Sequence, residues 1–517
     1  MASIASARGL QWRRRATLAL GVLVAAACSC GPRGGASREP ALVVLIPRDV
    51  QALDPRFTVD AYGLKLSRLL FASLVTIDPH TLAVVPDLAD SVEVTTDTSY
   101  RVHLRPGLRF SDGSALDAED VAATFRSIID PALGSRYAQT YRRIERIEVV
   151  DPLTVVFHLS GPHATFMTDL EMPVLRAEDA HARVGTLGGP ALVGSGPYVL
   201  RERVPGRLEL GANAYWQHGT PLHPRVRMLV IHDDNTRALR LLAGAADLAL
   251  NAVPPVLLPL FEHDPRFAVR SAPGVGTTYL GLNLESSVLR DVRVRRALAS
   301  AIDRPALIRA KLGGRARLAR SYVPPGHWAF SRDVPLQDYD LGRARALLAQ
   351  AGYGPGRKPL HLTLRCGSDR FRQSLARALA AMLARAGIDV EVRPSEIATL
   401  IADLNRGRFE LTTLELPELL EPHLLSWFFG SDHVPEHGRE GANRWRFRNA
   451  AFDAALERGR THTDLAVRRE AYDQAQRILA EQLPVIPLWH EDTVAVESAA
   501  ARDVRVPRTA RFDTLAR

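Results

Sequence analysis

Apolar and polar side chains alternate from Tyr100 to Leu104, which is the period of a strand with one buried face. Two turns follow, and Asp117 then stands where a helix N-cap belongs, with Asp120 placed to complete a capping box. From there the apolar positions recur at helical spacing until Pro131, which stops a helix. Residues 100–131 therefore predict a strand, two turns and a capped helix.

Strand-like and helix-like patterns also alternate along the rest of the chain. The expected strands are 41–46, two between 148 and 159, 248–250, 279–283, 360–364 and 388–392. The expected helices are 61–74, 237–244, 292–302, 339–352, 372–386 and 468–483. This alternation predicts an α/β protein, and 517 residues suffice for two or three domains with large cores.

Residues 100–121 also resemble a family signature, Tyr-x-Phe-x-Leu-Arg-x-Gly-x-x-Phe-x-Asp-Gly-x-x-x-x-Ala-x-Asp-Val, with Val102 in place of the Phe. The signature belongs to the family 5 extracellular solute-binding proteins, the oligopeptide- and dipeptide-binding receptors of bacterial ABC importers. Gly194–Tyr198 resembles the family's Gly-Thr-Gly-Pro-Tyr, and Pro484–Leu488 resembles its closing Pro-x-Ile-Pro-Leu. The resemblance covers about residues 41–517.

This resemblance implies a two-lobed periplasmic-binding-protein fold of α/β class, of the large class II type, with an extra domain inserted in the first lobe. On that basis lobe I comprises residues 41–75, 185–272 and 484–517, the inserted subdomain 76–184, and lobe II 273–483. The chain is expected to cross between lobes near 272–274 and 482–484. Relatives bind solutes between the lobes, which close by a hinge motion.

The N-terminus resembles an export signal. Arg13–Arg15 form a basic region, and the apolar run of 12 residues at 16–27 is too short to span a bilayer as a helix. Cys28 then follows Ala26-Ala27 as in a lipobox, where the thiol receives lipid, with Cys30 as the alternative. We expect a signal peptide at 1–27, a tether at 28–40, and a receptor lipid-anchored to a membrane in the periplasmic space.

Charge and cysteine usage narrow the classes of function. The formal charge of +9 falls to +5 without residues 1–27, and the arginines are spread along the chain. Nucleic-acid binding requires a clustered basic patch, so no nucleic-acid partner is expected. Cys366 alone lies in the expected folded body, which excludes a disulfide framework, and we expect a monomer.

Candidate catalytic motifs fail on their context. His433 to His437 has the spacing of an inverted zinc-protease motif, but Pro435 lies inside it and Gly438 follows, so a helix is not expected. Ser195 lacks the glycine two residues before the serine that a nucleophile elbow requires. We therefore expect a binding protein and not an enzyme, with no cofactor and no metal.

The resemblance points to an acid for ligand binding. Peptide-binding relatives carry Gly-Trp-x-x-Asp-x-x-Asp/Glu-Pro, whose first acid pairs with the ligand's α-ammonium. Placing Glu421-Pro422 on its end puts Glu418 on the ammonium-binding position, although Glu415 replaces the Trp and Pro417 is added. A carboxylate in a desolvated site holds an ammonium by charge-assisted hydrogen bonds. The alternative for Glu418 is a solvated loop acid.

Other candidate ligand contacts lie further along lobe II. Dipeptide-binding relatives use an Arg just after the strand at 360–364 for the ligand carboxylate, and Arg365 and Arg370 bracket that place. Asn443 and Trp445 combine hydrogen-bond donors with an aromatic ring in a Gly-rich segment. The alternatives are surface arginines and structural packing of the Trp.

The resemblance implies a solute receptor that delivers its cargo to ABC permease subunits in the inner membrane. The expected cargo is a peptide or a similar amine-bearing small solute. An oligosaccharide, an opine or a metal chelate remains an alternative cargo, and a signalling receptor remains an alternative role.

Overall fold

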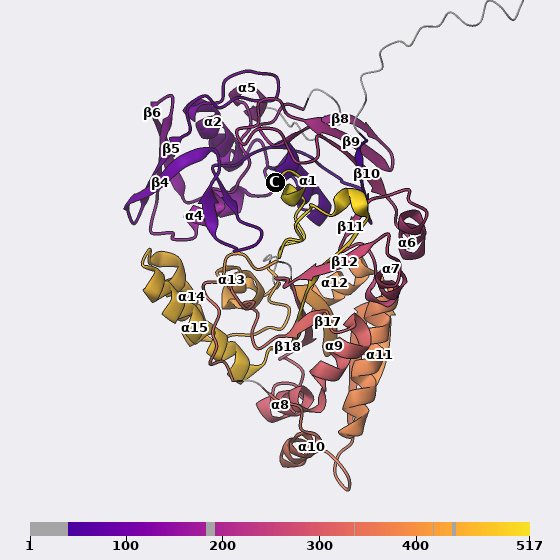
Figure 1. Cartoon of the computed structure of the whole chain (residues 1–517). Coiled ribbons are helices and arrows are strands. Elements are labelled where there is room, and N and C mark those ends of the chain that lie inside the picture. The colour runs from indigo at the N-terminus through magenta and orange to yellow at the C-terminus, as the bar shows by residue number, and fades with distance from the viewer. Residues whose placement is uncertain (1–39, 182–191, 336, 417, 437–440) are drawn as a thin grey trace, which may run out of the picture. The chain divides into compact units, whose positions relative to one another are not determined.

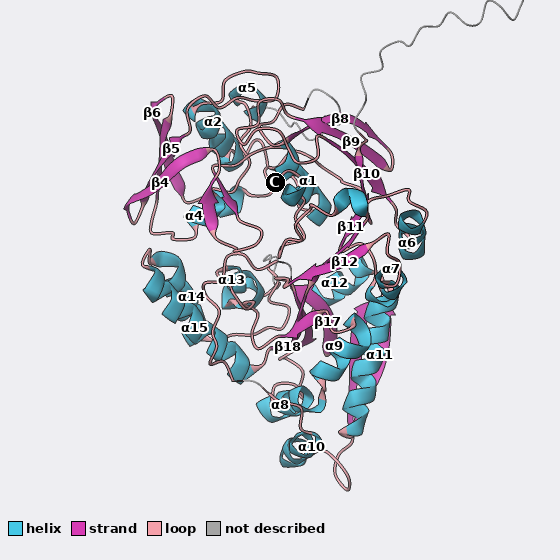
Figure 2. Ribbon diagram, viewed as in Figure 1, coloured by secondary structure: helices cyan, strands magenta, loops and turns pink. Residues whose placement is uncertain are grey.

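Two mixed β-sheets, each covered by helices, and a smaller antiparallel sheet organise residues 41–517 (Figures 1 and 2). The structure is a computed structural model that describes residues 40–181, 192–335, 337–416, 418–436 and 441–517. The expected signal and tether, with Cys28 and Cys30, lie outside the described residues. The prediction of an α/β fold with two lobes and an inserted domain is confirmed.

The sheet of lobe I has seven strands and gathers segments from both ends of the chain. Its order is β12 (Ala268–Ala272), β19 (Thr493–Glu497), β11 (Leu248–Leu250), β1 (Leu42–Ile46), β10 (Arg225–Val230), β9 (Arg207–Ala212) and β8 (Tyr198–Val204). Successive residues of β1 point to opposite faces, so Val44 joins one core and Leu45 the other. Helices α6 (Asp234–Leu242) and α7 (Pro259–Glu262), with the 3-10 turn η2 (Pro255–Leu257), cover the second face.

Helix α1 (Ala61–Leu70) packs on the first face of that sheet and carries part of the candidate site. Asp60 caps it, because its side chain accepts from the Gly63 N–H at 2.7 Å. The helix ends at Leu70, before the expected residue 74, where the Gly194-Ser195-Gly196 segment meets it. A Cβ on Gly194 would lie 2.0 Å from the Leu70 carbonyl oxygen, so this motif serves close backbone packing.

The inserted subdomain has a four-stranded antiparallel sheet and one long helix. The strand order is β4 (Ala89–Thr96), β5 (Ser99–Leu104), β7 (Thr154–Leu159) and β6 (Ile144–Asp151), and β2 (Val75–Ile77) pairs with β3 (Val84–Pro86). Helix α2 (Ala118–Ile129) has the predicted capping box between Asp117 and Asp120. The short helices are α3 (Ala138–Tyr141), α4 (Phe166–Asp169) and α5 (Ala177–Ala180).

Lobe II is a six-stranded sheet between two layers of helices. The strand order is β14 (Ala316–Leu318), β18 (Val485–Glu491), β13 (Thr277–Leu282), β17 (Leu411–Leu416), β15 (Leu360–Gly367) and β16 (Ile388–Ser395). One layer contains α8 (Val292–Ala301), α9 (Arg304–Leu312), α10 (Leu341–Gln350) and α11 (Arg370–Arg385). The other contains α12 (Ile397–Asn405), α13 (Leu424–Phe429), α14 (Ala450–Thr461) and α15 (Leu465–Gln482). The 3-10 turn η3 (Ser431–His433) follows α13.

The chain crosses between the two large sheets twice, and the two crossings touch. The first runs from β12 to β13, as expected near residues 272–274. The second differs from the expected place at 482–484, because β18 still pairs in lobe II and the chain crosses only between Glu491 and Thr493. A Cβ on Gly274 would lie 1.8 Å from the Glu491 carbonyl oxygen, so only glycine permits this contact.

The inserted subdomain also contacts lobe II directly, away from the crossings. The Ala164 N–H donates to the Arg460 carbonyl at 2.7 Å, and the Arg460 guanidinium donates to the Pro162 carbonyl at 3.0 Å. The Thr168 hydroxyl donates to Glu421 at 3.3 Å. Lobe II therefore contacts lobe I at the crossings and also contacts the inserted subdomain.

The carboxylate of Glu171, whose side chain is 12% exposed, holds the C-terminal segment against lobe I. That segment contains η4 (Ala499–Ala501) and η5 (Asp513–Leu515). Arg511, 1% exposed, forms a bidentate ion pair with Glu171 of the subdomain at 2.5 and 3.1 Å. Arg68 of α1 contacts the same carboxylate at 3.2 Å. Burial alone would raise the pKa of Glu171, but the two guanidinium groups outweigh it and lower the pKa to about 2.

We predict that Glu171→Gln lowers the free energy of unfolding by about 3–5 kcal/mol, because the buried Arg511 loses its carboxylate partner. Urea denaturation followed by circular dichroism measures this change. Glu178→Gln is the matched control, since Glu178 is 70% exposed and its pair with Arg176 should contribute less than about 1 kcal/mol. Equal losses for the two variants would contradict the assigned role of Glu171.

Candidate functional site

Two of the predicted ligand contacts, Asn443 and Trp445, are buried in lobe II. The Asn443 amide donates to the carbonyls of Phe429, Gly430 and Phe447 at 2.7–3.2 Å and accepts from the Phe447 N–H, so it holds a loop together. Trp445 is 0% exposed and packs edge-on against Tyr279 in the core. Neither side chain has surface available for a solute.

The two arginines predicted for a ligand carboxylate differ in their surroundings. Arg365 on β15 is held within lobe II, because its guanidinium pairs with Asp403 at 2.8 Å and donates to the Arg408 carbonyl at 2.8 Å. Arg370 is the first residue of α11 and is exposed. Its charge acts on Asp233 of lobe I, whose pKa is lowered mainly by its hydrogen bonds to Thr236. Of these two arginines, only Arg370 remains available to a solute.

Glu418 lies beyond the end of β17, on the side of lobe II that faces α1 and the C-terminal segment. It is half-buried, and its charge acts on Lys65 and Arg511 of lobe I and on Glu415 of its own lobe. These effects define a group of charges that we call the interlobe charge cluster. On the lobe I side its members are Lys65 and Arg68 of α1, Glu171 of the subdomain and Arg511 of the C-terminal segment. On the lobe II side its members are Arg372, Glu415, Glu418 and Glu491.

Sheet topology brings Glu415 and Glu491 together. Strand β13 lies between β17 and β18, and Thr278 stands opposite Glu415 on one side and Trp489 on the other. Glu491 accepts from the Trp489 indole at 3.1 Å, while Glu415 pairs with Arg372 at 3.1 Å. Burial and the neighbouring Glu491 raise the pKa of Glu415 to about 7. The Glu415 side chain is 39% exposed, so protons and solutes can reach it.

Lys65 of lobe I lies near these acids. Its ammonium lies 5.1 Å from the ring centroid of Tyr62 and 5.7 Å from that of Phe512. Burial lowers the pKa of Lys65, and the charges of Glu418 and Glu415 oppose that shift. Arg68 and Arg511, which also lie near Lys65, are already paired with Glu171. The half-buried ammonium is therefore held by aromatic rings and distant acids.

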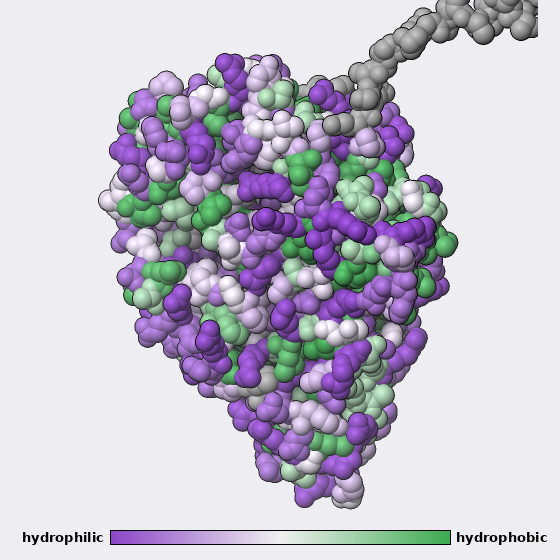
Figure 3. All heavy atoms as spheres, in the orientation of Figure 1, coloured by the Kyte–Doolittle hydropathy of each residue, from purple (hydrophilic) through white to green (hydrophobic). Residues whose placement is uncertain are grey.

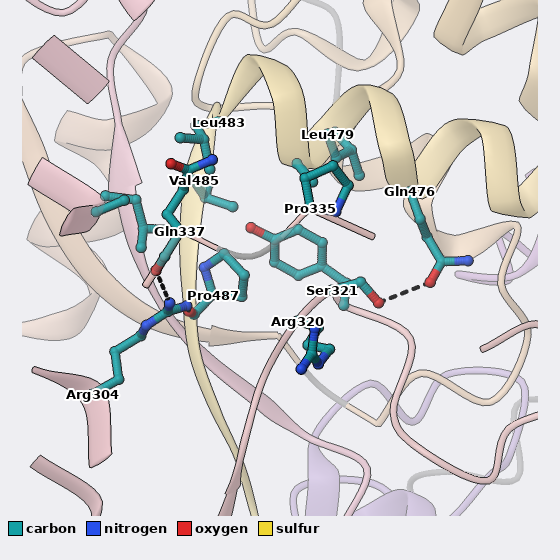
Figure 4. A pocket seen from close by; sticks show the side chains of 14 residues that line it. Arg304, Arg320, Ser321, Pro335, Gln337, Gln476, Leu479, Leu483, Val485 and Pro487 are labelled. Atoms are coloured by element: carbon teal, nitrogen blue, oxygen red, sulfur yellow. Dashed lines mark hydrogen bonds between the residues drawn. The ribbon is translucent and has the colours of Figure 1, made fainter. Parts of the chain in front are cut away.

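A cavity of about 220 Å³ adjoins the same helix. Leu64, Ser67 and Arg68 line it from α1, and the side chains of Tyr137 and Met172 line it from the subdomain. A smaller cavity of about 20 Å³ lies inside lobe II, where Ser321 donates to Gln476 at 2.8 Å (Figure 4). The second cavity has room for about one water molecule. The cavity beside α1 has room for a side chain of a solute.

The described residues contain no candidate metal site and no candidate membrane-spanning helix. Among the described residues, His, Cys, Asp and Glu side chains form no group that could hold a metal ion, and His437 of the zinc-like motif lies outside those residues. None of the described helices combines the length and hydropathy needed to cross a bilayer. On the face shown in Figure 3, hydrophilic side chains predominate and hydrophobic ones are scattered in small groups.

Lys65 and Arg372 were not predicted from the sequence. Arg372 is the third residue of α11, and its N–H donates to the N-cap Asp369 at 2.8 Å. The predicted helix began at Arg372 itself, which hid its position on the first turn. An N-cap search would have found Asp369 and moved the helix start. No local pattern distinguishes Lys65, because its relation to Glu418 depends on lobe packing.

Comparisons with known proteins agree on the family. The sequence profile of the bacterial extracellular solute-binding proteins, family 5, matches residues 83–418. Di/tripeptide-binding protein 2 of Pseudomonas aeruginosa is 28% identical over 85% of this chain and 87% of its own. The glutathione-binding protein GsiB of Escherichia coli is 28% identical over 94% of both chains.

The fold has similar solved structures. NikA from Brucella suis, solved in complex with Fe(III)-EDTA, superposes with a TM-score of 0.81 at 23% identity, covering 92% of this chain and 99% of that one. The likeness concerns the fold. The profile match spans more than half of the chain, and it confirms the prediction of a solute-binding protein rather than an enzyme. The chain belongs to the bacterial extracellular solute-binding proteins of family 5, the receptors of ABC importers.

Proposed function

We propose that this protein captures peptides, or similar small solutes with a free amine, between its lobes and delivers them to an ABC permease in the inner membrane. The observation that carries the proposal is Glu418, a half-buried carboxylate on lobe II that makes no ion pair or hydrogen bond with any described residue. The ammonium group of a ligand would supply an ion-pair partner for Glu418. Relatives named for di/tripeptides and for glutathione support a peptide-like cargo.

Capture would proceed by hinge closure around the two crossings. The crossings touch at Gly274 and Glu491, so a change in a few backbone angles there would turn one lobe against the other. The subdomain contacts made by Arg460 and Glu421 lie elsewhere on lobe II and would form or break with that motion.

The receptor would be lipid-anchored through Cys28 and face the periplasmic space as a monomer. The basic region, the short apolar run and Ala26-Ala27-Cys28 support this part of the proposal.

A metal chelate is the second candidate cargo, because three cations of the interlobe charge cluster lie on its lobe I side. Native mass spectrometry of protein purified from its host distinguishes peptide from chelate.

We predict that Glu418→Gln weakens binding of a free-amine peptide about ten- to a hundredfold, the usual strength of a charge-assisted hydrogen bond. N-acetylation of the peptide should weaken binding to the wild-type protein by a similar factor and should have little further effect on the variant. Isothermal titration calorimetry measures all four affinities.

Small-angle scattering of the same samples should show a smaller radius of gyration once peptide is bound.

The control for this experiment is Glu410→Gln, a carboxylate on the same segment that accepts from the Thr363 N–H within lobe II. It should leave the effect of acetylation unchanged. Additive losses from Glu418→Gln and acetylation would mean that the two groups do not meet. The assignment of Glu418 would then be withdrawn.

We predict that affinity for a free-amine peptide, expressed per molecule of its ammonium form, falls as the pH is lowered from 8 to 6. A nearby ammonium favours the ionised form of Glu415, whose pKa in the free protein is about 7, so binding at lower pH must first remove a proton. Calorimetry across this range measures the slope. In Glu415→Gln the slope should be much smaller, and an unchanged slope would show that another group titrates.

We predict that Cys28 carries the lipid. Cells labelled with an alkyne fatty acid should modify the wild-type protein and fail to modify Cys28→Ala, while Cys30→Ala should be labelled normally. Loss of labelling in Cys30→Ala alone would move the anchor to that residue. Labelling of neither protein would remove the lipid anchor from the proposal.

A further inference from the structure

Two opposite charges of the interlobe charge cluster lack partners among the residues that the structure describes. Arg372 pairs with Glu415, and Arg68 and Arg511 pair with Glu171. Lys65 and Glu418, by contrast, make no ion pair or hydrogen bond with any residue that the structure describes. One belongs to lobe I and the other to lobe II, and each acts electrostatically on the other. They are half-buried side chains of opposite sign on facing parts of the fold.

The surroundings of Lys65 suit an anion. Tyr62 and Phe512 wall the ammonium on its own lobe and supply no carboxylate. Removing an ammonium from water is unfavourable unless a counter-charge replaces the lost hydration. The acids of lobe II lie too far away to form an ion pair with Lys65. A carboxylate or phosphate oxygen of a solute would therefore stabilise its ammonium group. The cavity lined by Leu64 and Arg68 opens beside the same helix.

The cluster is also polarised as a whole. Its lobe I side contributes three cations and one carboxylate, and its lobe II side three carboxylates and one cation. A solute between the two sides is therefore favoured when its positive end faces lobe II and its negative end faces lobe I. A solute with an ammonium and no anion would meet Lys65 as a like charge.

We propose that Lys65 binds the carboxylate of a short zwitterionic solute whose ammonium is held by Glu418. This inference rests on the proposed function and adds a carboxylate site on lobe I. The solutes that fit are short peptides with both ends free, or amino-acid derivatives with an acidic group near the amine. Peptides that are amidated at the C-terminus, and simple amines, are disfavoured.

Arg370 is the competing site for the same carboxylate. It lies on lobe II at the start of α11, is exposed and makes no ion pair with a described residue. A carboxylate on Arg370 would place both ends of the solute on lobe II. A carboxylate on Lys65 would connect the solute to both lobes, so its loss would also affect closure.

The test uses the mature protein and a defined library of dipeptides and tripeptides, with binders identified by native mass spectrometry. The affinities of the best binder and of its C-terminal amide are then measured for wild type, Lys65→Met, Lys65→Arg and Arg370→Met. Amidation should weaken binding to wild type about ten- to a hundredfold and leave Lys65→Met almost unaffected. Lys65→Arg should restore the discrimination, and Arg370→Met should retain it.

Each other outcome overturns the proposal in a distinct way. Discrimination that is lost in Arg370→Met and kept in Lys65→Met assigns the carboxylate to lobe II. A bound peptide whose amide binds equally well removes the carboxylate site and leaves the peptide function intact. A library without any binder overturns the peptide function and this inference together. Thermal unfolding of each variant verifies the fold, and Lys65→Gln replaces Lys65→Met if the latter is unstable.

Discussion

The contact between the two chain crossings is the constraint on which the arrangement of the lobes depends. Gly274 and Glu491 lie so close that a single methyl group on Gly274 would overlap the Glu491 carbonyl. The two large sheets are therefore connected by two adjacent segments, one between β12 and β13 and one between β18 and β19. This connection fixes the positions of the residues beside it.

One consequence is the chemistry at the adjacent edge of lobe II. Because β13 lies between β17 and β18, the ends of those two strands put Glu415 and Glu491 on either side of it. Burial, together with the neighbouring carboxylate of Glu491, raises the pKa of Glu415. The position where peptide-binding relatives carry a Trp is thus a titratable, ion-paired acid here, and Arg372 is its partner. This edge of lobe II is therefore more polar than the family motif implies.

The other consequence is the return of the chain to lobe I. After the second crossing, β19 enters the first sheet and the C-terminal segment runs back over α1. Arg511 locks this segment to Glu171, and Phe512 comes to lie beside Lys65. The same segment therefore stabilises the lobe and shapes the surface that faces the acids of lobe II.

Local patterns in the sequence determined most of the elements and the family. The alternation at Tyr100–Leu104 and the capping box of α2 depend only on neighbours in the chain, so both were predicted correctly. Tertiary structure alone decided which sheet takes β18, because a buried apolar strand does not specify its partners. It also decided that Asn443 and Trp445 are structural, and that Lys65 faces Glu418 across more than 350 residues of sequence. Contacts of that range depend on how the lobes pack, which no local spacing of residues encodes.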